Sequence, residues 1–304
     1  MSYTYPPIKG KMPTHVLPER TALVLEGGGT RGFYSAGVFE AFMDAGVMFP
    51  YVIGVSAGSA NALSYVSGQP GRNRQIVEYY VSDTRYVSRR NLLRHRSLFG
   101  MEFVFHEIPQ KHIFWDWEMF REQSIRFLSG AIDCETGQTV WFEKDCLSPQ
   151  IEAVMASCSI PFVSPIVRYN GYSLLDGGIS DPIPIEKSIS DGNSYHVVVL
   201  TQNSGYRKEA FTHKALLKLF YRKYPKLIEA MLCRHEIYNR QLDLCERLAS
   251  DGKATIIRPL KPLRVGRAES DRDKLLALHD EWHEEGAAAL EAIMKPLGGL
   301  DTRH

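Results

Sequence analysis

The sequence lacks the features that mark membrane-spanning, secreted and nucleic-acid-binding chains. No apolar run approaches the roughly 18 residues that a helix needs to cross a bilayer. Residues 1–20 contain prolines and polar residues but no apolar core of a signal peptide, which predicts a cytoplasmic location. The 36 basic and 35 acidic residues nearly cancel, to a formal net charge of +1, so no overall field favours nucleic acid.

Cysteine is scarce and unpatterned. The five cysteines are an odd number without CxxC spacing, which predicts buried, reduced thiols. His279 and His283 lie four residues apart, but they do not form an HExxH pattern and no third ligand is evident. We therefore expect both histidines to face solvent, and no metal to be required.

What the sequence does contain is an ordinary globular composition with one dense cluster of motifs. Hydrophobic residues make up 44% and charged residues 23% of the 304 positions, enough for one large α/β domain with additions or two small domains. Between residues 21 and 60 the pattern predicts strand, glycine loop, helix, strand, serine and helix. The motifs within this stretch carry the chemistry.

A serine stands between two glycines at the predicted strand-to-helix turn, in Gly54-Val55-Ser56-Ala57-Gly58. This is the nucleophile-elbow arrangement, whose tight turn admits only small neighbours and holds the serine Oγ at the carboxyl edge of the sheet. We expect Ser56 to be an exposed nucleophile flanked by Gly54 and Gly58.

The glycine loop, residues 27–32, fits two kinds of site. Its Gly-x-Gly-x-x-Gly spacing matches the dinucleotide fingerprint, which also requires an acidic residue at the end of the next strand. Here the next strand ends at Val55 and is followed by Ser56, so the nucleotide interpretation lacks the acidic residue that would bind a ribose hydroxyl. Backbone N–H groups of successive glycines beside a serine instead favour an oxyanion hole for acyl transfer.

A third motif, Asp176-Gly177-Gly178, follows a predicted strand at residues 172–175. Alone, an aspartate before glycine is most simply a turn residue. Active-site residues of open α/β sheets, however, gather at strand ends, and two such motifs precede this one. We therefore expect Asp176 to lie at the same sheet edge as Ser56; in a dyad, where the carboxylate takes the Ser56 proton directly, the two side chains would lie within roughly 2.6–3.2 Å of each other.

In this order and with similar spacing, the three motifs resemble those of patatin-like phospholipases, and more specifically the bacterial branch of that family. The resemblance covers roughly residues 20–205. It implies a three-layer α/β/α sandwich with a mostly parallel central sheet. It also implies that Ser56 and Asp176 form a catalytic dyad, and that no metal, calcium or organic cofactor is needed. The segment Ser159-Ile160-Pro161 with the following Phe162 resembles the segment that packs behind the catalytic pair.

The resemblance also assigns the loop residues. It implies that Gly28 and Gly29 donate to the oxyanion, that Arg31 orients the loop or supports the charge, and that the remaining motif glycines shape the turns; these are Gly27, Gly32, Gly54, Gly58, Gly177 and Gly178. Glu26 departs from the Asp or Ser that relatives often carry at its position. We expect this to matter little, because the oxyanion donors come from the backbone.

Two alternatives stay open at this point. A GxSxG motif also marks α/β-hydrolases with a Ser-His-Asp triad, and a glycine loop could belong to a non-enzymatic nucleotide-binding or scaffold protein. No histidine after Asp176 has an evident loop context; they are His196, His213, His235, His279, His283 and His304. We favour a lipid or phospholipid substrate, hydrolysed as by a phospholipase A or lysophospholipase; no protein partner is indicated.

The rest of the chain predicts accessory structure. We expect residues 1–20 to form an extended arm, residues 21–205 the acyl hydrolase domain, and residues 206–304 a mainly helical extension packed on that domain. Residues 85–96 hold five arginines, which indicate either a solvated face or peripheral contact with anionic lipid. Aromatic residues between 99 and 120 indicate core packing first and lining for an acyl chain second.

Overall fold

The computed structural model describes residues 3–295, so His304 and the ends of the predicted arm and extension lie outside the described residues. The strands are β1 (His15–Val16), β2 (Thr21–Leu25), β3 (Val47–Met48), β4 (Tyr51–Val55), β5 (Arg126–Asp133), β6 (Thr139–Glu143), β7 (Val167–Tyr169), β8 (Tyr172–Asp176), β9 (Tyr195–Val199) and β10 (Ala254–Ile257). The α-helices are α1 (Phe33–Asp44), α2 (Ala57–Val66), α3 (Arg72–Tyr80), α4 (Arg89–His95), α5 (Trp117–Glu122), α6 (Glu152–Ser157), α7 (Ile185–Ser190), α8 (Lys214–Tyr221), α9 (Pro225–Ser250) and α10 (Arg272–Met294).

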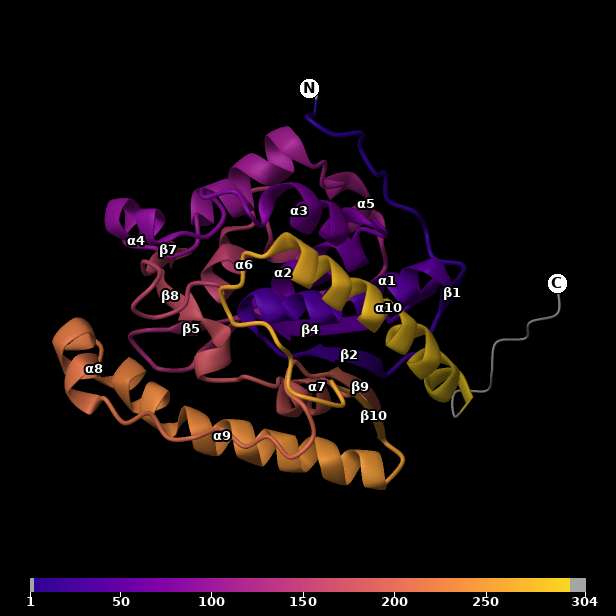
Figure 1. The fold of residues 1–304 in the computed structure, drawn as a ribbon. Coiled ribbons are helices and arrows are strands. Elements are labelled where there is room, and N and C mark those ends of the chain that lie inside the picture. The colour runs from indigo at the N-terminus through magenta and orange to yellow at the C-terminus, as the bar shows by residue number, and fades with distance from the viewer. Residues whose placement is uncertain (1–2, 296–304) are drawn as a thin grey trace.

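A mixed sheet forms the middle of the molecule (Figure 1), in the order β10-β9-β2-β4-β5-β8-β7, with β6 also paired to β5. The five strands from β10 to β5 are parallel, and β6, β7 and β8 join antiparallel. The apolar runs of β2 and β4 are buried along their whole length, as expected for parallel strands covered on both faces. Because parallel strands end at one edge, β2 and β4 deliver the glycine loop and Ser56 to neighbouring places.

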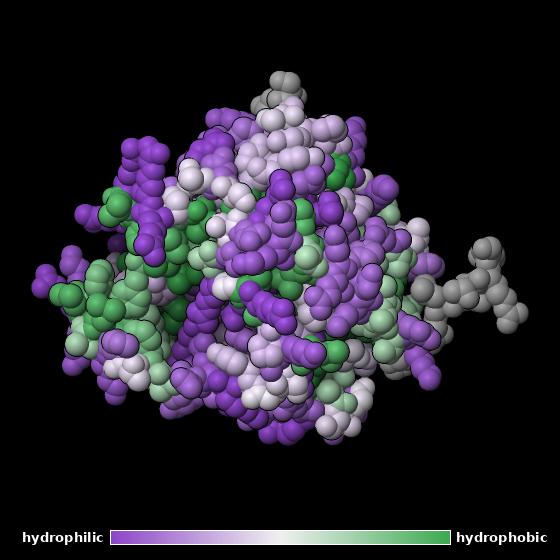
Figure 2. Space-filling view, viewed as in Figure 1, coloured by the Kyte–Doolittle hydropathy of each residue, from purple (hydrophilic) through white to green (hydrophobic). Residues whose placement is uncertain are grey.

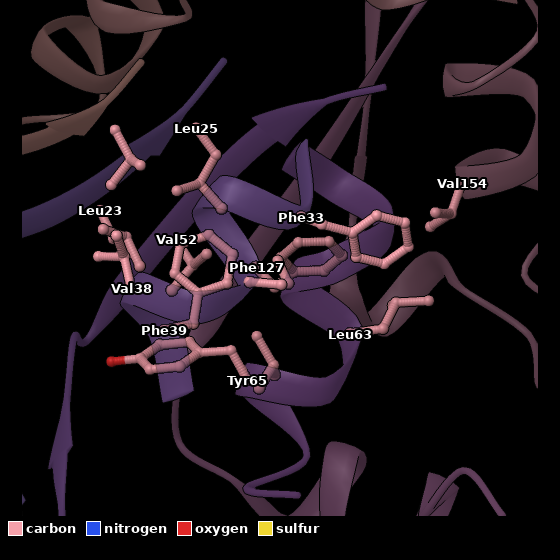
Figure 3. Close-up of a cluster of buried hydrophobic side chains, with 14 of the residues drawn as sticks. Leu23, Leu25, Phe33, Val38, Phe39, Val52, Leu63, Tyr65, Phe127 and Val154 are labelled. Carbon is pink, nitrogen blue, oxygen red and sulfur yellow. The ribbon is translucent and has the colours of Figure 1, made fainter. Parts of the chain in front are cut away.

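Helices cover both faces of this sheet. α1, α2 and α10 lie on one face, where Leu23, Phe39 and Phe127 belong to the larger hydrophobic core (Figure 3). α7 and α9 lie on the opposite face (Figure 1), over a smaller core that includes Val24 and Leu242. The predicted three-layer α/β/α sandwich with a mostly parallel sheet is therefore confirmed.

The region after residue 205 contributes to all three layers. β10 extends the parallel sheet beside β9, α9 covers one face, and α10 packs against α1 on the other. α1 and α10 approach closely: a Cβ added at Gly37 would lie 2.4 Å from the carbonyl oxygen of His279. The Tyr34 and Trp282 rings meet edge to face between the same helices, with centroids 4.3 Å apart. The boundary at residue 205 stays a prediction.

The histidine and cysteine predictions need correction. His279 is 2% exposed, and its Nε2 lies 3.1 Å from Glu40 Oε2 in the α1–α10 contact, so the expectation that it faces solvent is wrong. All five cysteines are free, but only Cys134 and Cys245 are buried; Cys146 is exposed and Cys158 and Cys233 are half-buried, so the expectation of buried thiols is wrong for these three. Helical periodicity places His279 on a face, whereas only the packing of α10 on α1 decides that this face is buried.

Candidate active site

Ser56 occupies a strained turn between β4 and α2. Its backbone has φ 54° and ψ −133°, a conformation that residues other than glycine rarely adopt. The Ser56 N–H donates to Ser157 Oγ at 2.8 Å, and that hydroxyl donates to the Gly130 carbonyl at 2.5 Å. No Cβ would fit at Gly54 or Gly58, which approach the backbone of α2 and β2. The local chain is therefore the predicted elbow, and Ser157 anchors it.

Asp176 ends β8 and meets Ser56 across the sheet edge. Ser56 Oγ donates to Asp176 Oδ2 at 2.7 Å, within the predicted range, while the Gly178 N–H donates to Asp176 Oδ1 at 2.8 Å. The Asp176 N–H donates to the Ser159 carbonyl at 2.9 Å. Burial raises the pKa of the Asp176 carboxyl above its ordinary value, against the opposing Ser56 hydrogen bond and the charge of Arg234.

The two side chains are more enclosed than the sequence predicted. Ser56 is 5% and Asp176 is 6% exposed, although we expected the Ser56 hydroxyl to be exposed. The glycine loop, Ile160 and Pro161 line the same pocket and cover the pair. The sequence predicts that an elbow presents its serine, but not what later segments place over it.

The glycine loop follows β2 and runs directly past Ser56. A Cβ added at Gly27 would lie 2.7 Å from Ser56 Cβ, and one added at Gly32 would lie 2.6 Å from Ala57 Cβ. Within residues 3–295, the N–H groups of Gly28 and Gly29 donate to no carbonyl or side chain. Both residues line the pocket that holds Ser56. Unengaged backbone donors beside a serine are what an oxyanion hole requires.

Glu26 has a larger structural role than we expected from the sequence. Its buried carboxylate accepts from the Thr201 N–H at 2.6 Å and from the Tyr238 hydroxyl at 3.0 Å. Burial raises the pKa of Glu26, while these hydrogen bonds oppose the rise. Because Thr201 follows β9 and Tyr238 belongs to α9, Glu26 ties the start of the glycine loop to both.

Residues after α9 also hold the glycine loop. The Thr30 N–H donates to the Arg267 carbonyl at 3.0 Å, and Thr30 Oγ1 donates to the Gly266 carbonyl at 3.1 Å. Gly29 adopts φ +59° at this contact, and a Cβ there would lie 2.3 Å from the Arg267 oxygen. The loop is thus clamped by a segment more than 230 residues away in the sequence.

Two pockets of different chemistry meet at Ser56. The first is apolar and is lined by side chains that include Phe33, Phe99, Val104 and Phe105. The aromatic residues between 99 and 120 therefore serve both purposes: Phe120 is in the core, Phe105 belongs to the core and also lines this pocket, and the half-buried Phe99 lines it as well.

The second pocket is charged. Beside Ser56, Asp176 and the glycine loop it is lined by four cationic side chains: Arg31, Lys208, Arg234 and Arg267. The sequence motifs include Arg31 but none of the other three. They come from segments far apart in the chain, and no local motif marks them.

No histidine of the described chain lines either pocket. His196, on β9, is buried with its Nδ1 3.1 Å from Ser188 Oγ, and His283 pairs with Asp44. The part of the chain that the structure describes also contains no cluster of His, Cys, Asp and Glu that could hold a metal ion.

Comparisons with known proteins identify the family and relatives of this chain. Residues 23–188 match the sequence profile of a family described as patatin-like phospholipase, and residues 224–298 match a domain of unknown function, DUF6363. Uncharacterized protein YjjU of Escherichia coli K12 is 27% identical over 60% of this chain and 52% of its own length. An uncharacterized NTE family protein of Mycobacterium tuberculosis H37Rv is 28% identical over 55% of this chain and 44% of its own.

Similarity extends to a named enzyme and to a solved structure. Lysophospholipase NTE1 of Yarrowia lipolytica is 24% identical over 57% of this chain and 12% of its own length. VipD of Legionella pneumophila matches with a TM-score of 0.42 and 13% identity, over 90% of this chain and 67% of that one. This chain thus spans about half the length of the first curated relatives it matches. Because the patatin profile alone covers more than half of its residues, the chain belongs to the patatin-like phospholipase family.

Proposed function

We propose that the protein is a serine acyl hydrolase that cleaves lipid esters through a Ser56–Asp176 dyad. The observation that carries the proposal is the 2.7 Å hydrogen bond from Ser56 to Asp176 at a strained elbow. The apolar pocket supports a fatty acyl substrate, and the lysophospholipase named among the relatives supports the same class of reaction.

In the first half-reaction, Asp176 takes the Ser56 hydroxyl proton as Oγ attacks the ester carbonyl carbon. The negative charge that forms on the carbonyl oxygen is stabilised by the N–H groups of Gly28 and Gly29, while Arg31, whose Nε lies 3.5 Å from the Gly28 carbonyl oxygen, orients the loop or supports the charge. The intermediate collapses, the alcohol leaves with the proton held by Asp176, and the acyl group stays on Ser56. Burial of Asp176 suits this role, because a raised pKa makes its carboxylate a better base.

In the second half-reaction, Asp176 takes a proton from water, and the resulting hydroxide attacks the acyl carbon. The same N–H groups stabilise the second oxyanion. Collapse of this intermediate releases the fatty acid, and the proton returns from Asp176 to Ser56 Oγ. Neither half-reaction requires a metal or an organic cofactor.

The test combines labelling and product analysis. A fluorophosphonate probe should label wild-type protein at Ser56 and leave Ser56→Ala unlabelled, and a mixed lipid extract should yield free fatty acids and lysolipids by mass spectrometry. Ser56→Ala should lose about 10⁶-fold in turnover. Retained turnover above about one part in a hundred, with contaminating esterase excluded, would refute the assignment. His196→Gln should keep its turnover; its loss in a folded protein would favour a triad.

We also propose that the enzyme meets its lipid at a membrane surface through α8. The helix exposes Leu216, Leu219 and Phe220, and Figure 2 shows hydrophobic surface over this region with hydrophilic surface beside it. No acidic residue occurs between 212 and 228, whereas six basic side chains do: His213, Lys214, Lys218, Arg222, Lys223 and Lys226. Exposed apolar residues among basic ones favour anionic lipid.

The arginine run of residues 85–96 supports the same surface only in part. Arg85 forms salt bridges with Asp83 and Glu107, which accounts for it as a structural residue. The arginines of α4 are exposed. The segment after α4 and helix α8 both contact residues 162–163, beside the site: the Leu98 N–H donates to the Val163 carbonyl, and the Phe162 N–H donates to the Tyr221 hydroxyl of α8. No helix of residues 3–295 is long and apolar enough to span a bilayer.

The membrane proposal is tested with vesicles and a soluble ester. Replacing Leu219 and Phe220 by serine should weaken binding to phosphatidylglycerol vesicles tenfold or more, because each side chain loses apolar area that the bilayer would bury. Leu260→Ser is the matched control, since Leu260 is 80% exposed but lies outside α8. Neutralising Arg89, Arg90 and Arg94 should cost about 1 kcal/mol of binding each, less at high salt. Unchanged vesicle binding in both variants would refute the proposal.

A further inference from the structure

Three of the four cationic side chains that line the charged pocket at Ser56 come from the part of the chain that follows residue 205. Lys208 comes from the segment before α8, Arg234 from α9, and Arg267 from the loop between β10 and α10. Arg234 donates to the Gly178 carbonyl, immediately beside Asp176. Lys208 Nζ lies 5.4 Å from the centroid of the Tyr238 ring, which also lines the pocket. Three cations from three segments thus converge on one hollow.

Their charges are not balanced within the described chain. None of Lys208, Arg234 and Arg267 is within 4.0 Å of a carboxylate oxygen in residues 3–295. The carboxylates that line the pocket, Glu26 and Asp176, already accept hydrogen bonds from other groups. Burial and the neighbouring arginines lower the pKa of Lys208 to about 7, as expected where positive charge lacks a counter-ion.

The position of the charged pocket relative to the apolar one indicates which portion of the substrate it receives. The two pockets share Gly29, Ser56 and Ile160 and otherwise have different linings. An ester whose carbonyl carbon meets Ser56 Oγ, and whose acyl chain fills the apolar pocket, directs its alcohol portion into the charged pocket. The cations therefore face the group that leaves in the first half-reaction.

We propose that Lys208, Arg234 and Arg267 bind a phosphate group on the alcohol portion of the substrate, and so select phosphate-bearing esters over neutral ones. The inference rests on the proposed hydrolase function. Guanidinium groups match phosphate oxygens in paired hydrogen bonds, and a lysine adds a compact point charge. It also gives a role to the region of residues 224–298, to which Arg234 and Arg267 belong: that region completes the substrate site of the patatin-like domain.

The first experiment measures selectivity. The ratio of kcat/KM for a monoacylglycerol phosphate to that for the monoacylglycerol with the same chain should fall about tenfold or more in Arg267→Gln and in Lys208→Gln. Arg264→Gln is the matched control, because Arg264 is an exposed arginine of the same loop that does not line the pocket, and it should leave the ratio unchanged. Equal ratios in all four proteins would overturn the inference. Arg234 is left intact, since it also supports Gly178.

The second experiment measures binding without turnover. Calorimetry on Ser56→Ala should show glycerol 3-phosphate binding that is lost when Arg267→Gln is added and kept when Arg264→Gln is added. Binding that survives both would overturn the inference. Inorganic phosphate should bind more weakly than glycerol 3-phosphate, and equal affinity would overturn the assignment to a substrate. Hydrolysis by Ser56→Ala would refute the proposed function while leaving this binding result intact, so the two failures are distinguishable.

Discussion

Gly29→Ala provides the sharpest test of the glycine loop. The added Cβ would lie 2.3 Å from the Arg267 carbonyl oxygen, far below the separation that real Cβ atoms tolerate, and Gly29 has φ +59°. An L-residue in the left-handed region costs about 1–2 kcal/mol. The Arg267 oxygen cannot retreat freely, because it accepts the Thr30 N–H at 3.0 Å. The loop must therefore shift, and the Gly29 N–H turns away from its place beside Ser56.

The expected effect on catalysis follows from losing one oxyanion donor. Such a loss costs about 2.7–4 kcal/mol, so kcat should fall roughly 10²–10³-fold. The assay is turnover of a soluble short-chain p-nitrophenyl ester, with thermal unfolding measured in parallel. Gly28→Ala should cost less, because its Cβ would meet the Thr201 side-chain hydroxyl at 2.9 Å, and a side chain can rotate.

Gly252→Ala is the matched control. Gly252 has φ +70° in the turn after α9, and a Cβ there would meet nothing within 4 Å. It should lose about the same 1–2 kcal/mol of unfolding free energy as any alanine at positive φ, while its kcat stays unchanged. If folded Gly29→Ala turns over as fast as Gly252→Ala, the glycine loop does not form the oxyanion hole.

Two further predictions concern protons. Asp176→Asn should lose about as much turnover as Ser56→Ala, because the effects of residues that act as one catalytic unit are not additive. An active Asp176→Asn would contradict the dyad. The kcat of the wild-type protein should rise with pH at values above the ordinary carboxyl range, because burial raises the pKa of Asp176 and this base acts in its ionised form. For a phosphodiester substrate, whose charge is constant, kcat/KM should fall as pH rises through about 7, because burial and the neighbouring arginines lower the pKa of Lys208 to that value although Glu26 opposes the shift. Lys208→Gln should abolish this limb of the pH profile, and an unaltered limb would contradict the role of Lys208.

Much of the fold could be predicted because it depends on local patterns. The apolar runs of β2, β4 and β9 indicate buried parallel strands, and helical periodicity predicts α10 over its observed bounds, Arg272–Met294. The cap of α5 was also predictable, since Asp116 Oδ1 accepts the Met119 N–H at 3.1 Å. Such features depend on residues within a few positions of one another, which a sequence displays directly.

The placement of Ser56 beside Asp176 could be predicted for a different reason. Both residues end strands, and strands of one sheet bring their ends together whatever their separation in the chain. Ser157 and Arg267 could not be found in this way. Their positions depend on how α6 and the loop before α10 fold back over the sheet, and no local sequence pattern predicts where these segments pack. The enclosure of Ser56 has the same origin.

The contact of Thr30 and Gly29 with residues 266–267 limits how the gene can be divided. A truncated gene that ends after residue 205 would still encode both members of the dyad and all the motif glycines. Its product would lack the Gly266 and Arg267 carbonyls that accept hydrogen bonds from Thr30, the Tyr238 hydroxyl that donates to Glu26, and β10 beside β9. In this chain, the segment that matches the family profile therefore does not include all the residues that hold its glycine loop in place. Transplanting the patatin-like segment into another protein would require a new brace for its glycine loop.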